Sequence, residues 1–190
     1  MELFLDAIQN FFVGQRVIKR FATEKTTVGF LADTIENFKH QRKSFLVDNV
    51  GSGLLRKLYA TYLSFLPEES FCQRLNLHSD SRGSFIEFVK TKESGQFSIF
   101  TAKPGQTRGG HYHHTKNEKF MVLNGTAKFC FRNILNGDCF TLKMEGLSPS
   151  VVESVPGYWH SITNIGDCEL LVALWTNEVF EPDRPDTFSG

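Results

Sequence analysis

The sequence predicts a mainly β protein, a sandwich or closed barrel, with a small α-helical appendage at its N-terminus. Two observations predict this class. Apolar residues recur at helical spacing before Pro67. After it, short alternating runs are separated by turn signals, with no helical pattern between them. Many short strands at this spacing are typical of sandwiches and barrels.

The segment before the proline reads as three short helices and one strand. Helical spacing marks residues 3–12 and 30–38, and Thr27 stands as the N-cap of the second helix. Residues 16–26 are basic and β-branched and suit one strand, and a third helix is expected over 53–65. Such pieces rarely bury enough surface to stand alone. They form either a docking appendage or the tail of a larger domain.

The segment after the proline alternates between apolar and polar residues. Asn-Gly pairs at 124–125 and 136–137 predict two hairpin turns, because this pair adopts the backbone that a tight turn needs. The expected strands are 85–89, 96–102, 120–123, 127–134, 151–155, 160–164 and 169–175.

Composition and charge restrict the function classes. Apolar residues make up 41% of the chain, which supports a packed core, and 21 basic side chains balance 21 acidic ones. Nucleic-acid binders usually carry a basic excess, so that class is disfavoured. No stretch approaches 18 apolar residues and the start lacks a basic signal-peptide region, so we expect a cytoplasmic protein with no membrane partner. The four cysteines form no C-x-x-C pair and read as buried apolar residues or free thiols.

The strongest chemical signal is a pair of histidines followed by a glutamate. His111 and His113 stand two apart on an extended segment, so both side chains leave the same face. Glu118 begins the next expected strand and can reach the same point, and His160 is well placed as a fourth ligand. Imidazoles with one carboxylate suit transition metals better than Mg or Ca. We expect one divalent metal, with zinc as the first choice.

This pattern resembles the two motifs of the cupins. The first, G-x5-H-x-H-x4-E-x6-G, is met in full over 105–125. The second, G-x5-P-x-G-x2-H-x3-N, is met in its latter half by Gly157, His160 and Asn164. Pro156 directly precedes Gly157 instead of standing two before it, and Ser150, six residues before Pro156, replaces the leading glycine. The resemblance implies a double-stranded β-helix, a jelly-roll barrel, with the metal inside its mouth.

Two segments are similar to deoxysugar epimerases of the dTDP-4-dehydrorhamnose 3,5-epimerase type. Residues 80–87 match their D-x-R-G-x-F-x-E opening, and residues 108–112 match their R-G-x-H-Y stretch. In that family such positions contact the nucleotide diphosphate and the histidine is the base. The resemblance therefore implies substrate contacts at Arg82, Glu87 and Arg108 and a base at His111. The plainer alternative is a turn at the first segment with an exposed Arg82.

A narrower resemblance covers most of the chain. The span 27–187 is similar to the C-terminal part of bifunctional capsular polysaccharide synthesis enzymes of the CapF type. It implies the end of a short-chain dehydrogenase/reductase domain at 1–50, a helical linker at 51–70 and a cupin domain at 71–181, with Gln96 as a further substrate contact. The matching stretches are L-A-D-T-I at 31–35, L-Y-A-T-Y-L-S at 58–64, Q-F-S at 96–98, R-G-G-H-Y-H-H-T at 108–115 and W-T-N-E-V-F at 175–180.

In that family the cupin epimerises C3 of a UDP-4-keto-2-acetamido-2,6-dideoxyhexose, and the reductase then reduces the 4-keto group with NADPH, on the route to N-acetyl-fucosamine for the capsule. The resemblance thus implies a sugar-nucleotide isomerase with a UDP-sugar as its small-molecule substrate. The chain has no glycine-rich turn at a helix start. We therefore expect no NADPH binding and no reductase activity. Because barrels of this class commonly pair, a homodimer is expected.

Epimerisation beside a ketone needs a base for the C3 proton and a group that stabilises the C4 enolate. If the first two histidines are both ligated, the candidates for the base are His114, Lys119 and Tyr158. A metal either polarises the ketone or only pins the strands. Two alternatives remain: a non-catalytic sugar-nucleotide-binding remnant, and a metal-dependent cupin oxygenase, which the same four ligands would serve.

Overall fold

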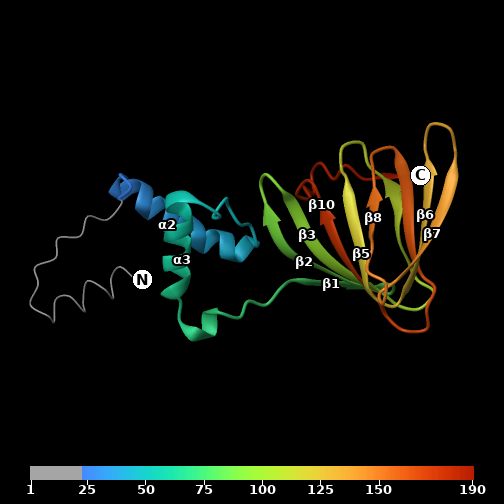
Figure 1. The fold of residues 1–190 in the computed structure, drawn as a ribbon, viewed down its shortest axis with the longest axis horizontal. Helices are drawn as coiled ribbons and strands as arrows, with labels where there is room; N and C mark the ends of the chain where they lie inside the picture. The colour runs from blue at the N-terminus through green and yellow to red at the C-terminus, as the bar shows by residue number, and fades with distance from the viewer. Residues whose placement is uncertain (1–22) are drawn as a thin grey trace, which may run out of the picture. The chain divides into compact units, whose positions relative to one another are not determined.

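The structure is a computed structural model that describes residues 23–190, and Figure 1 shows its fold. The chain divides into two compact units, 1–34 and 35–190. In the first unit the described residues begin helix α2 (Val28–Ser44), whose Phe30 N–H donates to Thr27 Oγ1 at 3.1 Å. The predicted cap is therefore confirmed. The helix expected at 3–12 lies outside the described residues, as does most of the strand expected at 16–26.

Two further helical elements follow in the second unit. They are α3 (Gly53–Ser64), where a helix was expected, and the short 3-10 helix η1 (Glu68–Ser70). Phe38 from α2 is 1% exposed, and its ring lies 5.1 Å from that of Tyr59 and 5.7 Å from that of Tyr62. One buried aromatic ring thus anchors the packing of these helices.

The rest of the chain forms two antiparallel sheets, which together make the barrel visible in Figure 1. The strand order is β1-β2-β3-β10-β5-β8 in one sheet and β11-β4-β9-β6-β7 in the other. The mainly β fold with a helical appendage is confirmed. The strands are β1 (Leu77–Asp80), β2 (Gly83–Thr91), β3 (Gly95–Ala102), β4 (Thr107–Tyr112), β5 (Glu118–Asn124), β6 (Thr126–Asn133), β7 (Cys139–Glu145), β8 (Val151–Ser154), β9 (Tyr158–Asn164), β10 (Leu170–Thr176) and β11 (Phe188–Ser189).

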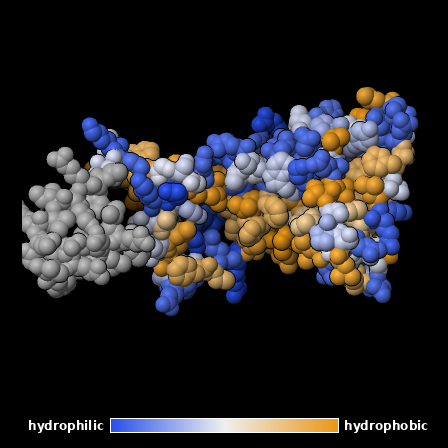
Figure 2. Space-filling view, in the orientation of Figure 1, coloured by the Kyte–Doolittle hydropathy of each residue, from blue (hydrophilic) through white to orange (hydrophobic). Residues whose placement is uncertain are grey.

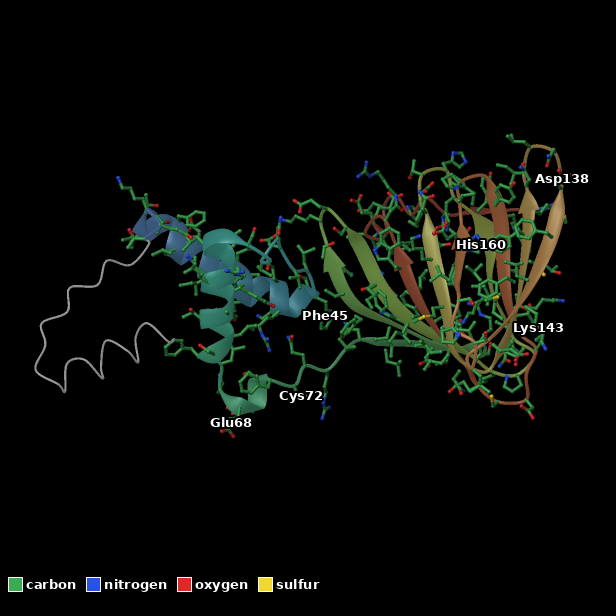
Figure 3. The ribbon with its side chains drawn as sticks, viewed as in Figure 1. Phe45, Glu68, Cys72, Asp138, Lys143 and His160 are labelled. Carbon is green, nitrogen blue, oxygen red and sulfur yellow. The ribbon has the colours of Figure 1, made fainter. Side chains whose placement is uncertain are left out.

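The barrel core consists of side chains from alternate strand positions. Phe129 is fully buried on β6, Ile162 on β9 is 2% exposed, and the Phe120 ring on β5 lies 5.7 Å from the Phe129 ring. Because side chains alternate across a strand, the same pattern that fills the core also directs His160 into the barrel, where Figure 3 labels it. The inward-facing strand positions thus supply both the core side chains and His160.

Two other features concern the cysteines and the membrane. The four cysteines are free thiols, and Cys72, Cys139 and Cys168 are exposed rather than buried. Of the two alternatives, free thiols are confirmed, and the alternative of buried apolar residues does not hold for these three. In the part of the chain that the structure describes, no helix has the length and apolar character needed to cross a membrane.

Candidate metal centre

Strand pairing brings the candidate ligands together. His111 on β4 is the Cα partner of His160 on β9, and the register shifts by a bulge between Gly109 and His111. Gly109 has φ of +77°, and a Cβ there would lie 2.9 Å from the His160 carbonyl oxygen. Only glycine tolerates this backbone and this close approach. The bulge therefore turns the first ligand into the barrel.

The four residues converge on one point. One ligand atom from each of His111, His113, Glu118 and His160 lies within 4.8 Å of the other three. Glu118 Oε2 lies 3.0 Å from His160 Nε2 and 3.4 Å from His113 Nε2. Except for His111, which is partly exposed, the residues are buried. The predicted set is thus brought together from β4, the loop after it and β5, which are adjacent in sequence, and from the distant strand β9.

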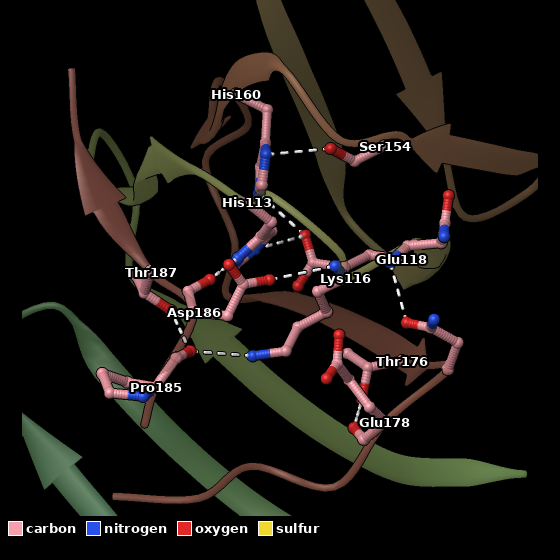
Figure 4. A network of polar contacts seen from close by, with 12 residues as sticks. His113, Lys116, Glu118, Ser154, His160, Thr176, Glu178, Pro185, Asp186 and Thr187 are labelled. Atoms are coloured by element: carbon pink, nitrogen blue, oxygen red, sulfur yellow. Dashed lines mark hydrogen bonds and ion pairs between the residues drawn. The ribbon is translucent and has the colours of Figure 1, made fainter. Parts of the chain in front are cut away.

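The outer ring nitrogens of two histidines already have partners. His160 Nδ1 lies 2.9 Å from Ser154 Oγ, and His113 Nδ1 is hydrogen-bonded to the Asp186 carbonyl oxygen, as Figure 4 shows. These contacts leave each Nε2 facing Glu118. Ligating histidines in metal sites are commonly oriented in this way by a second acceptor.

The electrostatics suit a cation. Burial raises the pKa of the Glu118 carboxyl, but the neighbouring His113 and His160 outweigh burial and lower the pKa to about 2. Burial, with the adjacent histidines, lowers the pKa of His111 to about 4. Burial also lowers the pKa of His113, but the Glu118 carboxylate outweighs it and the net shift is upward. At neutral pH the set offers an ionised carboxylate and a neutral His111, the protonation states that ligation requires.

A metal fits this set on the evidence of its unsatisfied atoms. His113 Nε2 and Glu118 Oε2 are buried and have no hydrogen-bond partner of acceptable geometry. Such groups are costly unless something binds them. Three imidazoles and one carboxylate match the donors that zinc and neighbouring transition metals accept. The four residues are therefore a candidate metal centre.

Two adjoining cavities share this centre. The larger, about 320 Å³, is lined by His111, His113 and Glu118 together with Glu87 and Gln96. The smaller, about 150 Å³, also contacts the centre and is otherwise lined mainly by the barrel core. Pockets for small molecules begin at about the volume of the larger one. Two residues that the sequence singled out as substrate contacts thus line the same cavity as the ligands.

Comparison with known families places this centre. Residues 78–188 match the family described as the polysaccharide biosynthesis C-terminal domain. The chain belongs to this family. The matched range contains all four candidate ligands and both cavity residues named above, so the centre lies inside the family's domain.

Relatives in this family agree with the resemblance seen in the sequence. A UDP-2-acetamido-2,6-β-L-arabino-hexul-4-ose reductase from Pseudomonas aeruginosa is 54% identical over 163 residues, which cover 86% of this chain. The capsular polysaccharide assembling protein CapF from Staphylococcus aureus matches with a TM-score of 0.86 and 36% identity over 98% of this chain. The chain spans 44% of the first protein and 52% of the second. The resemblance to a C-terminal part of the CapF type is confirmed.

More distant matches extend the comparison. The spore coat polysaccharide biosynthesis protein SpsL from Bacillus subtilis is 26% identical over 124 residues, 60% of this chain and 82% of its own length. Oxalate decarboxylase OxdC from the same species is 19% identical with a TM-score of 0.50, which shows a shared fold alone. Together with CapF, this likeness confirms the double-stranded β-helix.

The two arginines that the sequence singled out lie in different surroundings. The Arg108 side chain is 14% exposed; its Nε donates to the Thr101 carbonyl oxygen at 3.2 Å, and its Nη1 lies 3.2 Å from Asp80. Its Nη2 is buried without a hydrogen-bond partner, and the residue lines the smaller cavity. Arg82 is exposed and paired with Asp80, which also accepts from the Gly83 N–H as in the turn considered above.

Three of the residues considered as the base lie away from the larger cavity. Lys119 is exposed on β5 and pairs with Glu153, on the opposite side of the strand from Glu118. His114 is exposed and stacks on Tyr112. The Tyr158 ring lies 6.3 Å from that of Phe140. Of the four candidates, His111 alone lines the larger cavity.

Sequence reasoning missed a buried lysine. Lys116 is 6% exposed and lines the larger cavity beside the candidate ligands. Its ammonium donates to the Pro185 carbonyl oxygen at 3.0 Å and lies 5.6 Å from the centre of the Phe180 ring. The signal available in the sequence was its place between His113 and Glu118, but a lysine in a polar loop normally indicates a solvated side chain.

Proposed function

We propose that this chain is a metal-binding cupin that epimerises C3 of a UDP-linked 4-keto-2-acetamido-2,6-dideoxyhexose for capsular polysaccharide synthesis. The observation that carries the proposal is the cluster of His111, His113, Glu118 and His160 at the wall of a cavity of about 320 Å³. The 54% identical relative is named for a UDP-2-acetamido-hexul-4-ose, a 4-keto sugar, and supports this substrate class. CapF supports the capsular role.

Epimerisation at C3 requires the removal of one proton and the return of a proton to the opposite face of the sugar. A base removes the C3 proton, the electron pair of that C–H bond moves toward the C4 oxygen, and a proton returns to the opposite face. His111, His113, Glu118 and His160 would hold a divalent metal, with zinc as the expected ion, whose positive charge would polarise the ketone. The chain's own residues orient the sugar: Glu87 and Gln96 offer polar groups within the cavity, and Gln96 Nε2 lies 3.1 Å from Glu87 Oε1.

Deuterium exchange tests this function. The full chain, loaded with zinc, is incubated with the 4-keto UDP-sugar in heavy water, and the C3 proton signal is followed by NMR. We expect enzyme-dependent loss of that signal, because each proton removed is replaced from solvent. A protein that binds the sugar and zinc but leaves C3 unexchanged would be the non-catalytic binding module. No NADPH is needed in this assay, in line with the expected absence of reductase activity.

Arg108 provides a second prediction. Because its Nη2 is buried without a partner and the residue lines a cavity beside the centre, we propose that it contacts the diphosphate. Arg108→Ala should weaken UDP-sugar binding about ten- to a hundredfold, since a charge-assisted hydrogen bond contributes roughly 1.5–3 kcal/mol. Calorimetry measures the affinity, and elemental analysis of the same preparation should find unchanged zinc.

The exposed Arg184, whose only ion pair in the described part of the chain is with Glu181, gives the matched control. Arg184→Ala should bind the UDP-sugar as the parent does. The contacts of Arg108 with Thr101 and Asp80 favour the rival role of a brace within the barrel. Coupled loss of zinc and affinity in Arg108→Ala would support that brace and end the diphosphate role.

The homodimer also stays a prediction. Figure 2 shows apolar side chains at the barrel surface, and exposed ones include Leu135, Phe140 and Leu147. Exposed apolar residues of this kind favour association.

The domain assignments also stay proposals. The resemblance to the CapF-type enzymes assigns residues 1–50 to the end of a reductase domain and residues 71–181 to the cupin.

A further inference from the structure

The end of the chain lies along the candidate metal centre. Strand β11 pairs with β4, so that Ser189 is opposite His111 and Phe188 is opposite Tyr112. We call residues 185–189 the C-terminal strap and residues 113–116 the ligand loop. The strap joins this loop through both side-chain and main-chain contacts, which Figure 4 shows from close by.

The carboxylate of Asp186 makes most of these contacts. It accepts hydrogen bonds from three successive backbone N–H groups, those of His114 at 2.9 Å, Thr115 at 3.0 Å and Lys116 at 3.0 Å. The Thr115 hydroxyl lies 3.0 Å from it and 2.8 Å from the Glu178 carboxylate, and its single proton can be donated to either. A carboxylate that accepts several backbone N–H groups fixes their orientation, because each bond is directional and charge-assisted. One side chain thus holds the ligand loop in its conformation.

The main chain of the same residue reaches a ligand. The Asp186 carbonyl oxygen is hydrogen-bonded to His113 Nδ1. This bond places the proton on Nδ1 and leaves Nε2, which faces Glu118, free to ligate. Asp186 has φ of +41°, a left-handed backbone that aspartate and asparagine tolerate better than most residues. The unusual backbone and the two sets of contacts occur at one residue.

We propose that Asp186 is a positioning residue of the metal centre: by fixing the ring of His113 and the ligand loop, it sets the affinity for the metal. The inference rests on the metal binding proposed above and not on the epimerase activity. Outer partners of ligating histidines typically change metal affinity about ten- to a hundredfold when they are lost. The strap therefore contributes to the site from 73 residues beyond the ligand that it orients.

Zinc affinity of the full chain, measured by competition with a chromogenic chelator, tests this role. Asp186→Ala should bind zinc about ten- to a hundredfold more weakly. Asp186→Gly keeps access to the left-handed backbone but lacks the carboxylate, so it should lose nearly as much. Asp186→Asn keeps the backbone preference and one acceptor oxygen, and it should recover most of the affinity. Asp183→Asn removes an exposed carboxylate three residues before Asp186 and should leave the zinc affinity unchanged.

A cobalt-substituted sample separates positioning from general stability. The visible spectrum of bound Co²⁺ reports the ligand geometry, so it should change in Asp186→Gly and resemble that of the parent in Asp186→Asn. Wild-type zinc affinity and an unaltered cobalt spectrum in folded Asp186→Gly would overturn the proposal. So would a parent chain that binds no metal. By contrast, a parent that binds zinc tightly but fails to exchange C3 refutes the epimerase function alone.

Discussion

Glu118→Gln is expected to remove tight zinc binding, with an affinity loss of more than about a hundredfold. Loss of an outer partner costs up to about a hundredfold, and a direct ligand contributes more. The change keeps the size of the side chain but replaces its charge with a neutral amide. Glu118 is the only carboxylate in the cluster and lies 3.0 Å from His160 Nε2 and 3.4 Å from His113 Nε2. The site would then hold a divalent cation with neutral donors alone.

Elemental analysis of protein purified without added metal measures this directly. The parent should carry about one equivalent of zinc, because one four-ligand cluster is present among the described residues. A thermal melt gives an independent measurement, since saturating zinc at a thousand times Kd stabilises the folded chain by about 4 kcal/mol. Glu118→Gln should show no such shift. Its melting temperature without metal provides the baseline for each comparison.

The matched control is Glu153→Gln. Glu153 is an exposed carboxylate on β8, and its partner Lys119 is the residue next to Glu118. The control therefore removes the same charge from the same region without touching the centre, and it should keep its zinc. One equivalent of zinc and the parent's affinity in Glu118→Gln would show that the cluster is not the metal site.

The sequence predicted this cluster because its spacing is local. His111 and His113 are separated by one residue, and Glu118 stands five residues after His113. His160 was identified through the second motif, although Pro156 stands in an unusual place. The structure shows why the turn before His160 still forms although the proline is displaced from its place in the motif. Gly157 has φ of +80° and donates its N–H to the His113 carbonyl oxygen at 2.9 Å, so the glycine rather than the proline makes the essential contact.

Strands with a buried face were predicted better than exposed ones. The Asn-Gly pair at 136–137 lies in the hairpin between the paired strands β6 and β7, as predicted. The pair at 124–125 instead joins β5 to β6 in the other sheet, so the hairpin predicted there was wrong. Four strands were not named from the pattern: β1, β4, β7 and β11. Every residue of β1 is exposed and β7 is almost as exposed, while β4 contains two glycines and β11 has two residues. β1 and β4 lack the alternation of apolar and polar residues that marks a strand, and β11 is too short to show it. β7 does alternate, with Phe140, Leu142 and Met144 apolar, and its pattern was missed.

The features of the site that the sequence did not predict depend on contacts between segments that are distant in sequence. Asp186 contacts His113 across 73 residues, and no local periodicity connects a C-terminal aspartate with a histidine in the first motif. Lys116 reads as a surface lysine because its burial depends on Phe180 and Pro185 from the end of the chain.

Lys116→Met is expected to slow C3 exchange by about a hundred- to a thousandfold, the usual cost of removing one group that stabilises a developing oxyanion. Lys116 is 6% exposed and lines the cavity that the candidate ligands line. Among the described residues no carboxylate forms a salt bridge with it, and its partners are a carbonyl oxygen and an aromatic ring. A buried cation without an anionic partner is costly, and an enolate oxygen would provide that partner.

Methionine preserves the length and apolar stem of the side chain, so packing against Phe180 should persist while the charge is lost. The exchange rate is measured at saturating UDP-sugar, and zinc content is determined on the same sample and should equal the parent's. Lys119→Met removes the neighbouring exposed charge on β5 and should leave the rate unchanged. Lys116→Arg keeps the charge in a larger group and should recover part of the rate. Exchange at the parent's rate in zinc-replete Lys116→Met would show that the ammonium does not stabilise the enolate. The metal would then be the remaining cation that could do so.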